Sequence, residues 1–289
     1  MVGYDTQVER GFVTPISSPV SNVSGSVTEQ AVVRLMWPGR VAPDHMPTEA
    51  FDVAIVGGGV AGRTAGIFTA RHDLETVVLD AGSSILRRNA HLENFPGFPA
   101  GVNSRLLLRM MLAQAERAGC DYRETEVTAV EADGSGFTIT TTTGDVQAAA
   151  VIVATKNETD CLEPLDGIEL IDRGKTYVET DGRGRTGVDG LYAAGRLAQK
   201  PHQTIVNAGH GAEVAVTLLE DLDTPFYHDW VAPARYFTGR DRDVPPGCEE
   251  IDEAERRRRE DESIEVMRRY FDDPHPERPE MHPSVATDE

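Results

Sequence analysis

A Gly-X-Gly-X-X-Gly motif at residues 57–62 is the part of the chain best suited to bind phosphate groups. It follows the apolar run 52–56, typical of a buried strand, and precedes a segment whose apolar residues recur at helical spacing. In such a unit Gly57 permits the tight turn, Gly59 lets the backbone approach a pyrophosphate, and Gly62 allows close helix packing. The free amides at the helix N-terminus favour the same phosphates. The alternative is a glycine turn in an α/β domain that binds nothing.

An acidic residue, Asp80, ends the next apolar run, eighteen positions after Gly62. A carboxylate at the end of a second strand can accept hydrogen bonds from a ribose diol. Together with the glycine turn, Asp80 predicts an adenine dinucleotide as the ligand.

The order of elements after Asp80 favours FAD over NAD. Residues 81–102 are predicted to form a loop, and 103–119 a helix that begins at an Asn cap and ends at a glycine. The stretches that follow, from 122 to 155, alternate and are interpreted as antiparallel strands. An NAD-binding Rossmann domain would continue with strands and helices in turn, and an NAD-dependent enzyme is kept as an alternative. The predicted fold is α/β: a Rossmann-like FAD-binding domain of the three-layer β-β-α type with an antiparallel β-meander.

Four motifs in this order resemble the flavoprotein disulfide reductases, in particular the thioredoxin-reductase-like branch of the FAD-dependent pyridine nucleotide-disulfide oxidoreductases. They are ENFPGFP at 93–99, EVTAV at 126–130, VIVAT at 151–155 and TGVDGLYAAG at 186–195. The resemblance covers roughly residues 52–221 and implies an FAD-dependent oxidoreductase. Four matches in the family's order are much more specific than the glycine motif alone.

The resemblance also implies flavin contacts for single residues. Asn94 matches an asparagine that lies against the flavin, and Val127 matches a residue whose backbone meets the adenine. A helix predicted over 203–222 begins where the family's last long helix points its N-terminus at the flavin, which stabilises negative charge on the reduced ring. His202 stands where the family usually has arginine, and is predicted either to assist as a cation or to cap that helix. The FAD-contacting residues predicted are Gly57, Gly59, Ala61, Gly62, Asp80, Arg88, Asn94, Val127, Thr155, Gly195, Arg196, His202, Gln203 and Thr204.

Three departures from the family pattern change the expected chemistry. Arg196 replaces the aspartate that holds a ribityl hydroxyl, and a guanidinium cannot accept that hydrogen bond, so a contact to the pyrophosphate together with Arg88 is predicted instead. Lys156 replaces a glycine. Between Thr155 and Thr186 the chain has about thirty residues where the family inserts an NADPH-binding domain that bears a CxxC pair.

These departures leave the electron donor and the electron acceptor of the flavin undefined. The three cysteines form no CxxC pair, so the flavin is expected to exchange electrons with a partner protein, a diffusible donor or its substrate. Cys161 is interpreted as a core residue, with a charge-transfer thiol as the alternative. No residue is assigned a catalytic or metal-binding role. A non-catalytic flavin- or dinucleotide-binding sensor or scaffold would carry the same motifs and is the second hypothesis, and a homodimer is left open.

The charge balance is strongly acidic: 48 acidic residues against 28 basic ones, with a formal net charge of −20 and only three lysines. Dispersed negative charge with little lysine is expected of proteins kept soluble in high salt, so a halophilic source is predicted. The same charge argues against nucleic acids and anionic membranes as partners, because both need a positive face. No long apolar run and no signal-peptide pattern occur, which predicts a cytoplasmic protein.

The chain divides into three predicted regions. Residues 1–45 are interpreted as a disordered arm or as a mis-assigned start, with Met46 as the true one, and 46–222 as the FAD-binding oxidoreductase domain. Residues 223–289 form an extension, first aromatic, then acidic and partly helical, whose end is predicted to be disordered.

Two features of the extension are specific enough to test. Residues 249–271 are predicted to form a surface helix with the i,i+4 pairs Glu253–Arg257 and Glu255–Arg259. The aromatic segment around Trp230 is hypothesised to cover the open face of the flavin, as a lid or a dimer contact; the alternative is that it fills an apolar groove elsewhere.

Overall fold

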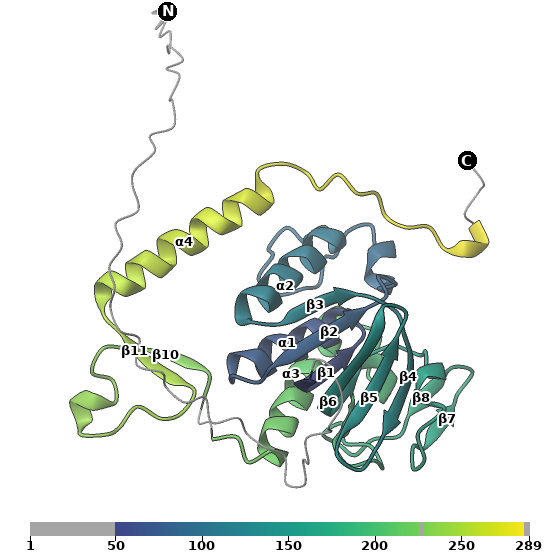
Figure 1. Ribbon diagram of the computed structural model, residues 1–289. Helices are drawn as coiled ribbons and strands as arrows, with labels where there is room; N and C mark the ends of the chain where they lie inside the picture. The colour runs from purple at the N-terminus through teal and green to yellow at the C-terminus, as the bar shows by residue number, and fades with distance from the viewer. Residues whose placement is uncertain (1–49, 226–227, 286–289) are drawn as a thin grey trace, which may run out of the picture. The chain divides into compact units, whose positions relative to one another are not determined.

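The computed structural model describes residues 50–225 and 228–285. Within them the central layer is one sheet of seven strands in the order β3-β2-β1-β6-β5-β4, with β9 beside β6 (Figure 1). The strands are β1 (Ala50–Val56), β2 (Thr76–Asp80), β3 (Asp121–Glu124), β4 (Val127–Ala132), β5 (Phe137–Thr141), β6 (Gly144–Val153) and β9 (Leu191–Ala193). β1 runs parallel to β2 and β6, whereas β4, β5 and β6 form an antiparallel meander.

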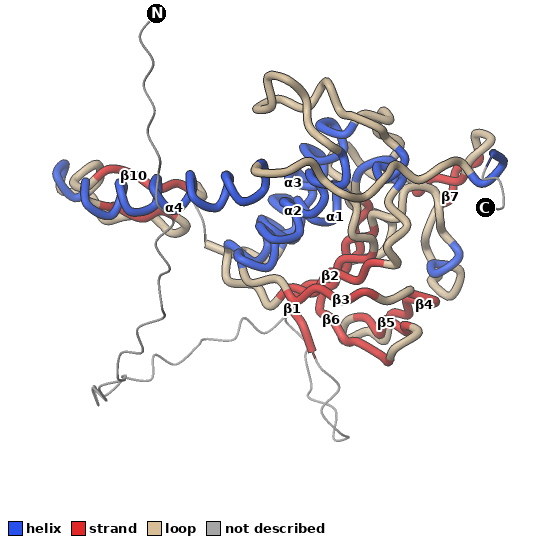
Figure 2. The backbone as a smooth tube through the Cα atoms, turned by 90° about the horizontal axis from the view of Figure 1, so that it is seen from above, coloured by secondary structure: helices blue, strands red, loops and turns tan. Residues whose placement is uncertain are grey.

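Both faces of β1 are buried, because its side chains alternate between two apolar clusters. Val53 and Ile55 share a cluster with residues of the helices α1 (Val60–Arg71) and α3 (Thr204–Asp221). Ala54 and Val56 share the other cluster with residues of the meander. Helix α2 (Ser104–Ala118) lies on the same side of the sheet as α1 and α3 (Figure 2). Burial on both faces explains the continuous apolar run, and the predicted mixed α/β class is confirmed.

β6 pairs with two different strands along its length, and this brings the carboxyl ends of the parallel strands to one edge of the sheet. Its first half pairs antiparallel with β5, and Val151–Val153 pair parallel with β9. The carboxyl ends of β1, β2, β6 and β9 therefore meet at one edge of the sheet. In open α/β sheets, ligands bind outside this edge.

Local sequence sets the ends of the predicted helices. The Asn103 side chain caps α2 by accepting hydrogen bonds from the backbone N–H groups of Arg105 and Leu106, at 3.0 and 3.2 Å. α2 ends at Gly119, which adopts the left-handed conformation with φ +108°. α3 begins directly after Gln203. Both predictions agree with the structure to within a residue or two, which is the usual uncertainty of helix ends.

The stretch 122–132, interpreted from its alternation as antiparallel, proves to be two strands. β3 pairs parallel with β2 at the edge of the sheet, and β4 begins the meander. The turn at Thr125 and Glu126 carries no glycine or proline, so nothing in the spacing marked the break.

A short antiparallel hairpin occupies the segment between Thr155 and Thr186, with strands β7 (Leu170–Asp172) and β8 (Thr176–Val178). The Gly-X-Gly-X-X-Gly spacing recurs formally at 182–187, in the loop between β8 and β9. No helix follows it there, so it lacks the free amides of a phosphate-binding turn.

The extension contains a parallel strand pair, β10 (Trp230–Pro233) and β11 (Cys248–Ile251), and the helix α4 (Glu253–Phe271). The helix begins four residues later than predicted, because residues 248–251 pair with β10 and Asp252 caps the first turn. Both predicted ion pairs are present, Glu253–Arg257 at 2.8 Å and Glu255–Arg259 at 2.7 Å.

Several predictions about the chain's ends remain predictions. The disordered arm over 1–45 and a true start at Met46 lie outside the described residues. The domain division and the disordered end are likewise untested, although Arg87 pairs with Glu277 at 3.2 Å and also with Glu280. No helix among the described residues is long and apolar enough to cross a bilayer.

Candidate functional site

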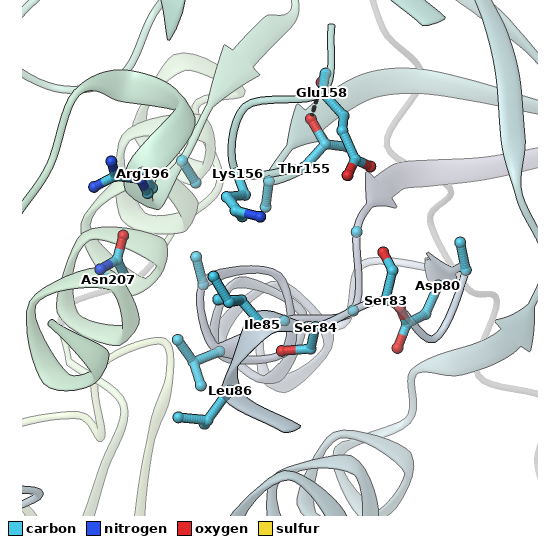
Figure 3. A pocket seen from close by; sticks show the side chains of 18 of the residues that line it. Asp80, Ser83, Ser84, Ile85, Leu86, Thr155, Lys156, Glu158, Arg196 and Asn207 are labelled. Carbon is cyan, nitrogen blue, oxygen red and sulfur yellow. Dashed lines mark hydrogen bonds between the residues drawn. The ribbon is translucent and has the colours of Figure 1, made fainter. Parts of the chain in front are cut away.

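A cavity of about 860 Å³ opens at the carboxyl edge of the sheet (Figure 3). Its walls are the glycine turn, the loop after β2 with the short helix η1 (Ile85–Arg88), the residues that follow β6, and the start of α3. Cofactor pockets commonly measure roughly 300–1,000 Å³. Most of the predicted contact residues line it, namely Gly57, Gly59, Ala61, Asp80, Arg88, Asn94, Val127, Thr155, Arg196, His202, Gln203 and Thr204. Gly62 and Gly195 do not line it and act through packing.

The glycine turn has the geometry that its spacing predicts. Gly57 has φ +107°, and a Cβ on it would lie 2.7 Å from the Ala154 carbonyl oxygen. A Cβ on Gly62 would lie 1.9 Å from the Gly57 carbonyl oxygen, so only glycine lets α1 approach the turn this closely. At Gly59, by contrast, the nearest atom would be the Ser84 hydroxyl oxygen at 3.8 Å. This position, at the N-terminus of α1, therefore leaves room for a ligand.

Asp80 lines the cavity but is held by a buried network. Its Oδ2 accepts hydrogen bonds from Arg63 at 3.1 Å and from the Tyr122 hydroxyl, and its Oδ1 accepts from the Gly82 amide at 2.9 Å. Arg63 and Asp80 are both buried, and burial with the Asp80 hydrogen bond raises the pKa of Tyr122 to about 12. Sequence reasoning missed Arg63 and Tyr122. The available signal was a cation one position after Gly62, inside a helix that packs on the sheet, because a buried cation requires a partner.

Asn94 and Gln203 meet at the start of α3. The Asn94 side-chain amide donates to Gln203 Oε1 at 2.8 Å. Gln203 is the residue before the helix, and no side chain caps the first turn of α3. The amides of that turn are therefore available to an acceptor in the cavity.

His202 fits neither of its two predicted roles well. It is not the cap residue, since that position belongs to Gln203. Partial burial and the positive charges of Arg196, Lys156 and Lys175 lower its pKa. A lowered pKa keeps His202 neutral at neutral pH, so other side chains supply positive charge here.

Arg196 lines the cavity, and its guanidinium is held by Asn157 and Tyr177. Its guanidinium donates to Asn157 Oδ1 at 3.3 Å and to the Tyr177 hydroxyl at 3.4 Å, and lies 5.9 Å from the Tyr177 ring centre. The Asn157 amide also donates to the Thr176 carbonyl at 2.9 Å. Arg196 thus ties the cavity wall to the β7–β8 hairpin.

Lys156 enters the cavity on a turn that ordinarily favours glycine. Its φ is +69°, and its side chain lines the cavity (Figure 3). Burial lowers its pKa, and the nearby charge of Glu158 opposes this effect. Among the described carboxylates, none forms an ion pair with Lys156, Arg196 or Arg88. Three cations thus line the cavity, and none of them has an ion-pair partner within residues 50–225 and 228–285.

Asn207, one turn into α3, was not predicted. Its amide nitrogen donates to the carbonyls of Pro201 at 2.8 Å and Gln203 at 2.6 Å. Its Oδ1 is buried and has no hydrogen-bond partner among the described residues. Asn207 lies on the same side of the cavity as Arg196, away from Asp80 (Figure 3).

His210, next along α3, has a structural role. Its Nδ1 accepts a hydrogen bond from the Gly195 amide at 2.9 Å, so the ring is neutral with its proton on Nε2. Burial, and to a lesser degree Lys200, lowers the pKa of His210 to about 4. His210 therefore holds the turn that follows β9.

Cys161 lines the cavity as a buried thiol whose pKa burial raises to about 11. It therefore stays protonated at neutral pH, which favours the predicted core role. Cys120, Cys161 and Cys248 are all unpaired. The residues that the structure describes contain no cluster of side chains suited to a metal ion.

The aromatic lid is not where the hypothesis put it. Trp230 packs against Tyr236 and Phe237, with ring centres 4.6 and 5.7 Å away. The adjacent Asp229 pairs with Arg71 at the last turn of α1. α1 has 12 residues, which makes it about 18 Å long, and the cavity lies at its other end. Phe226 and Tyr227 lie outside the described residues.

Comparisons with known proteins give partial matches. No family model matches the chain. The thioredoxin reductase of Streptomyces coelicolor is 40% identical over 134 residues, which are 45% of this chain and 41% of that protein. The ferredoxin–NADP reductase of Levilactobacillus brevis is 31% identical over 173 residues, 57% of this chain and 48% of that protein. The chain thus spans less than half the length of these curated relatives.

Solved structures match over a wider span. A thioredoxin reductase from Gloeobacter violaceus has a TM-score of 0.56 and 20% identity, covering 60% of this chain and 96% of that one. A ferredoxin-flavin thioredoxin reductase from Clostridium acetobutylicum has a TM-score of 0.51 and 16% identity, covering 61% and 98%. These matches share the fold. Together with the curated relatives they confirm the predicted resemblance to thioredoxin reductases.

Proposed function

We propose that this chain, whose sequence matches curated thioredoxin reductases over less than half of their length, is an FAD-dependent oxidoreductase. The observation that carries the proposal is the cavity at the carboxyl edge of the sheet, onto which the glycine turn opens. The curated relatives are named as reductases, which supports the same assignment.

The residues present fit FAD. The turn leaves open space at Gly59, and the N-termini of α1 and α3 both reach the cavity. The cations Arg88, Lys156 and Arg196, which form no ion pair with the described carboxylates, are suited to a cofactor that carries a pyrophosphate. When bound, FAD would supply the capacity to accept and release electrons. The protein would supply orientation and positive potential.

The electron partners are proposed to be external to the chain. Between Thr155 and Thr186 the structure has a short hairpin, and neither Cys120 nor Cys161 is paired with another cysteine. A partner protein, a diffusible donor or the substrate would therefore reduce the flavin. Two of the matched proteins carry ferredoxin in their names, which makes a reduced ferredoxin a sensible first donor to test.

The test is optical. Purified full-length chain incubated with FAD should retain flavin absorption near about 450 nm after desalting, and one of NADH, NADPH or reduced ferredoxin should bleach it. A folded protein that takes up no FAD would refute the proposal. Retained flavin that no donor reduces and no acceptor reoxidises would favour the sensor or scaffold hypothesis.

A matched pair of variants ties the flavin to the cavity. Gly59→Glu places a carboxylate where the phosphates should bind, at a position with extended backbone and open space, so folding should be spared. Gly209→Ala changes an exposed glycine of α3 that has nothing within 4 Å of the added Cβ. We expect the first to lose flavin and the second to keep it.

The net charge of −20 supports a further proposal, that the protein works in the cytoplasm of a halophile. Salt screens repulsion among like charges, so the melting temperature should rise between low and molar KCl. A melting temperature independent of KCl would contradict the halophilic part of the proposal.

A further inference from the structure

We infer that Asn207 binds FAD: its side-chain Oδ1 accepts a hydrogen bond from a ribityl hydroxyl. Arg196 cannot accept this bond, because a guanidinium carries donors only. The inference rests on the proposed FAD site. It assigns a function to an α3 side chain that no motif marks.

The orientation of the Asn207 amide is fixed by its neighbours. Its nitrogen faces two carbonyl oxygens, those of Pro201 at 2.8 Å and Gln203 at 2.6 Å. Exchanging nitrogen and oxygen would place Oδ1 against two other acceptors, which is repulsive. The oxygen therefore points away from these carbonyls.

The oxygen lies beside the turn that contains Arg196. A Cβ built on Gly195 would lie 3.1 Å from Asn207 Oδ1, and Gly195 has φ +67°, a conformation that favours glycine. The residue as a whole is only 7% exposed, and its Oδ1 has no protein partner among the described residues. Leaving such a buried acceptor unsatisfied costs about 1–3 kcal/mol. A donor from the occupant of the cavity would remove this penalty.

The position of Asn207 in the cavity indicates which part of FAD would donate the hydrogen bond to its Oδ1. Asp80, at the far end of the cavity, is suited to the ribose of the adenosine half, and Asn94 with Gln203 marks the end assigned to the flavin ring. Asn207 lies one turn beyond Gln203, and its neighbour Gly195 lies against Ala61 in the first turn of α1, where the pyrophosphate is expected. Between a pyrophosphate and a flavin ring, FAD offers the hydroxyls of its ribityl chain as donors.

Arg196 cannot serve this purpose, for two reasons. A guanidinium has donors only. It is also engaged with Asn157 and Tyr177 on the hairpin side. We therefore place the acceptor on the neighbouring helix, at Asn207.

The experiment measures affinity rather than turnover. Wild type and Asn207→Ala are each titrated with FAD and with FAD analogues that lack one ribityl hydroxyl at a time, using the change in flavin fluorescence. We expect wild type to bind one analogue about three- to tenfold more weakly than FAD, the range for one net hydrogen bond. Asn207→Ala should bind FAD and that analogue equally.

The analogues separate binding from folding. Loss of the contacts to Pro201 and Gln203 would weaken every flavin alike, whereas loss of the ribityl contact abolishes only the discrimination. If Asn207→Ala does not fold, wild type alone decides: equal affinity for FAD and all analogues overturns the inference. Discrimination that persists in the variant overturns it too. A wild-type protein that binds ADP but no flavin refutes the proposed function itself.

Discussion

The side-chain amide of Asn94 donates a hydrogen bond of 2.8 Å to Oε1 of Gln203, a residue 109 positions further along the chain. It joins the loop after η1 to the start of α3, and both residues line the cavity. Both side chains are exposed in the structure, so the bond alone stabilises the fold little. Its position suggests that it holds two walls of the cavity at the spacing that a flavin requires.

The first prediction is that Asn94 and Gln203 act as a pair in flavin binding. Asn94→Ala and Gln203→Ala should each weaken FAD binding, and the double variant should weaken it by less than the sum of the two. A coupling of about 0.5–1.5 kcal/mol is expected for one neutral hydrogen bond. The measurement is a double-mutant cycle of FAD dissociation constants. Strict additivity would mean that the two residues contact the flavin independently.

The sequence predicted those parts of the site whose residues are close together in the chain. The turn at Gly57 and Gly59 could be located because strand, glycines and helix are contiguous, and Asn94 because its motif resembles a family. The partners of Asp80 could not, since Arg63 and Tyr122 reach it from α1 and β3 only once the sheet has formed. Long-range side-chain pairing leaves no periodic signal.

Arg196 and Asn207 also show that sequence alone does not predict side-chain contacts. Both positions were visible in the sequence, but the direction of the Arg196 guanidinium depends on a hairpin whose path no motif describes. That Asn207 Oδ1 is buried without a hydrogen-bond partner among the described residues is found only once the structure is known. Burial and satisfaction of polar groups are properties of the packed chain.

The second prediction concerns the buried ion pair of Arg63 and Asp80, whose side chains are 8% and 6% exposed. Arg63→Met removes the cation and leaves the carboxylate buried with fewer donors, which should lower the free energy of unfolding by about 3 kcal/mol. Urea denaturation at neutral pH measures it. Arg257→Met, which breaks an exposed pair on α4, is the control and should leave the unfolding midpoint unchanged. Equal effects of the two variants would show that the buried ion pair contributes no more to the free energy of unfolding than the exposed one.

The third prediction uses two helical glycines with opposite surroundings. Gly62→Ala forces a Cβ to within 1.9 Å of the Gly57 carbonyl oxygen, so the turn must shift, at a cost of about 1–3 kcal/mol and with loss of FAD affinity. Gly209→Ala meets no atom within 4 Å and should stabilise the protein by about 0.5–1 kcal/mol. Thermal melting with and without FAD measures both. Tolerance of Gly62→Ala would mean that α1 is less tightly packed on the turn than the structure indicates.

The last prediction is a pH dependence that arises from His210. Its pKa falls from about 6.5 to about 4 on folding, because burial, and to a lesser degree the charge of Lys200, disfavours the imidazolium. Between these values the unfolded chain binds a proton that the folded chain does not, so stability is full above about pH 6.5 and declines as the pH falls toward 4. Between pH 7 and pH 5 the loss from this group should be about 1–2 kcal/mol.

The contribution of His210 can be isolated from that of the many carboxylates. His210→Asn removes the titrating ring, so the difference in unfolding free energy between wild type and variant should shrink as the pH falls from 7 to 5. His282→Gln, which alters an exposed histidine, should leave the difference constant. If His210→Asn also leaves it constant, the imidazole titrates alike in both states. The proton on Nε2 would then not be fixed by the Gly195 amide, and the turn that carries Arg196 would be held by packing alone.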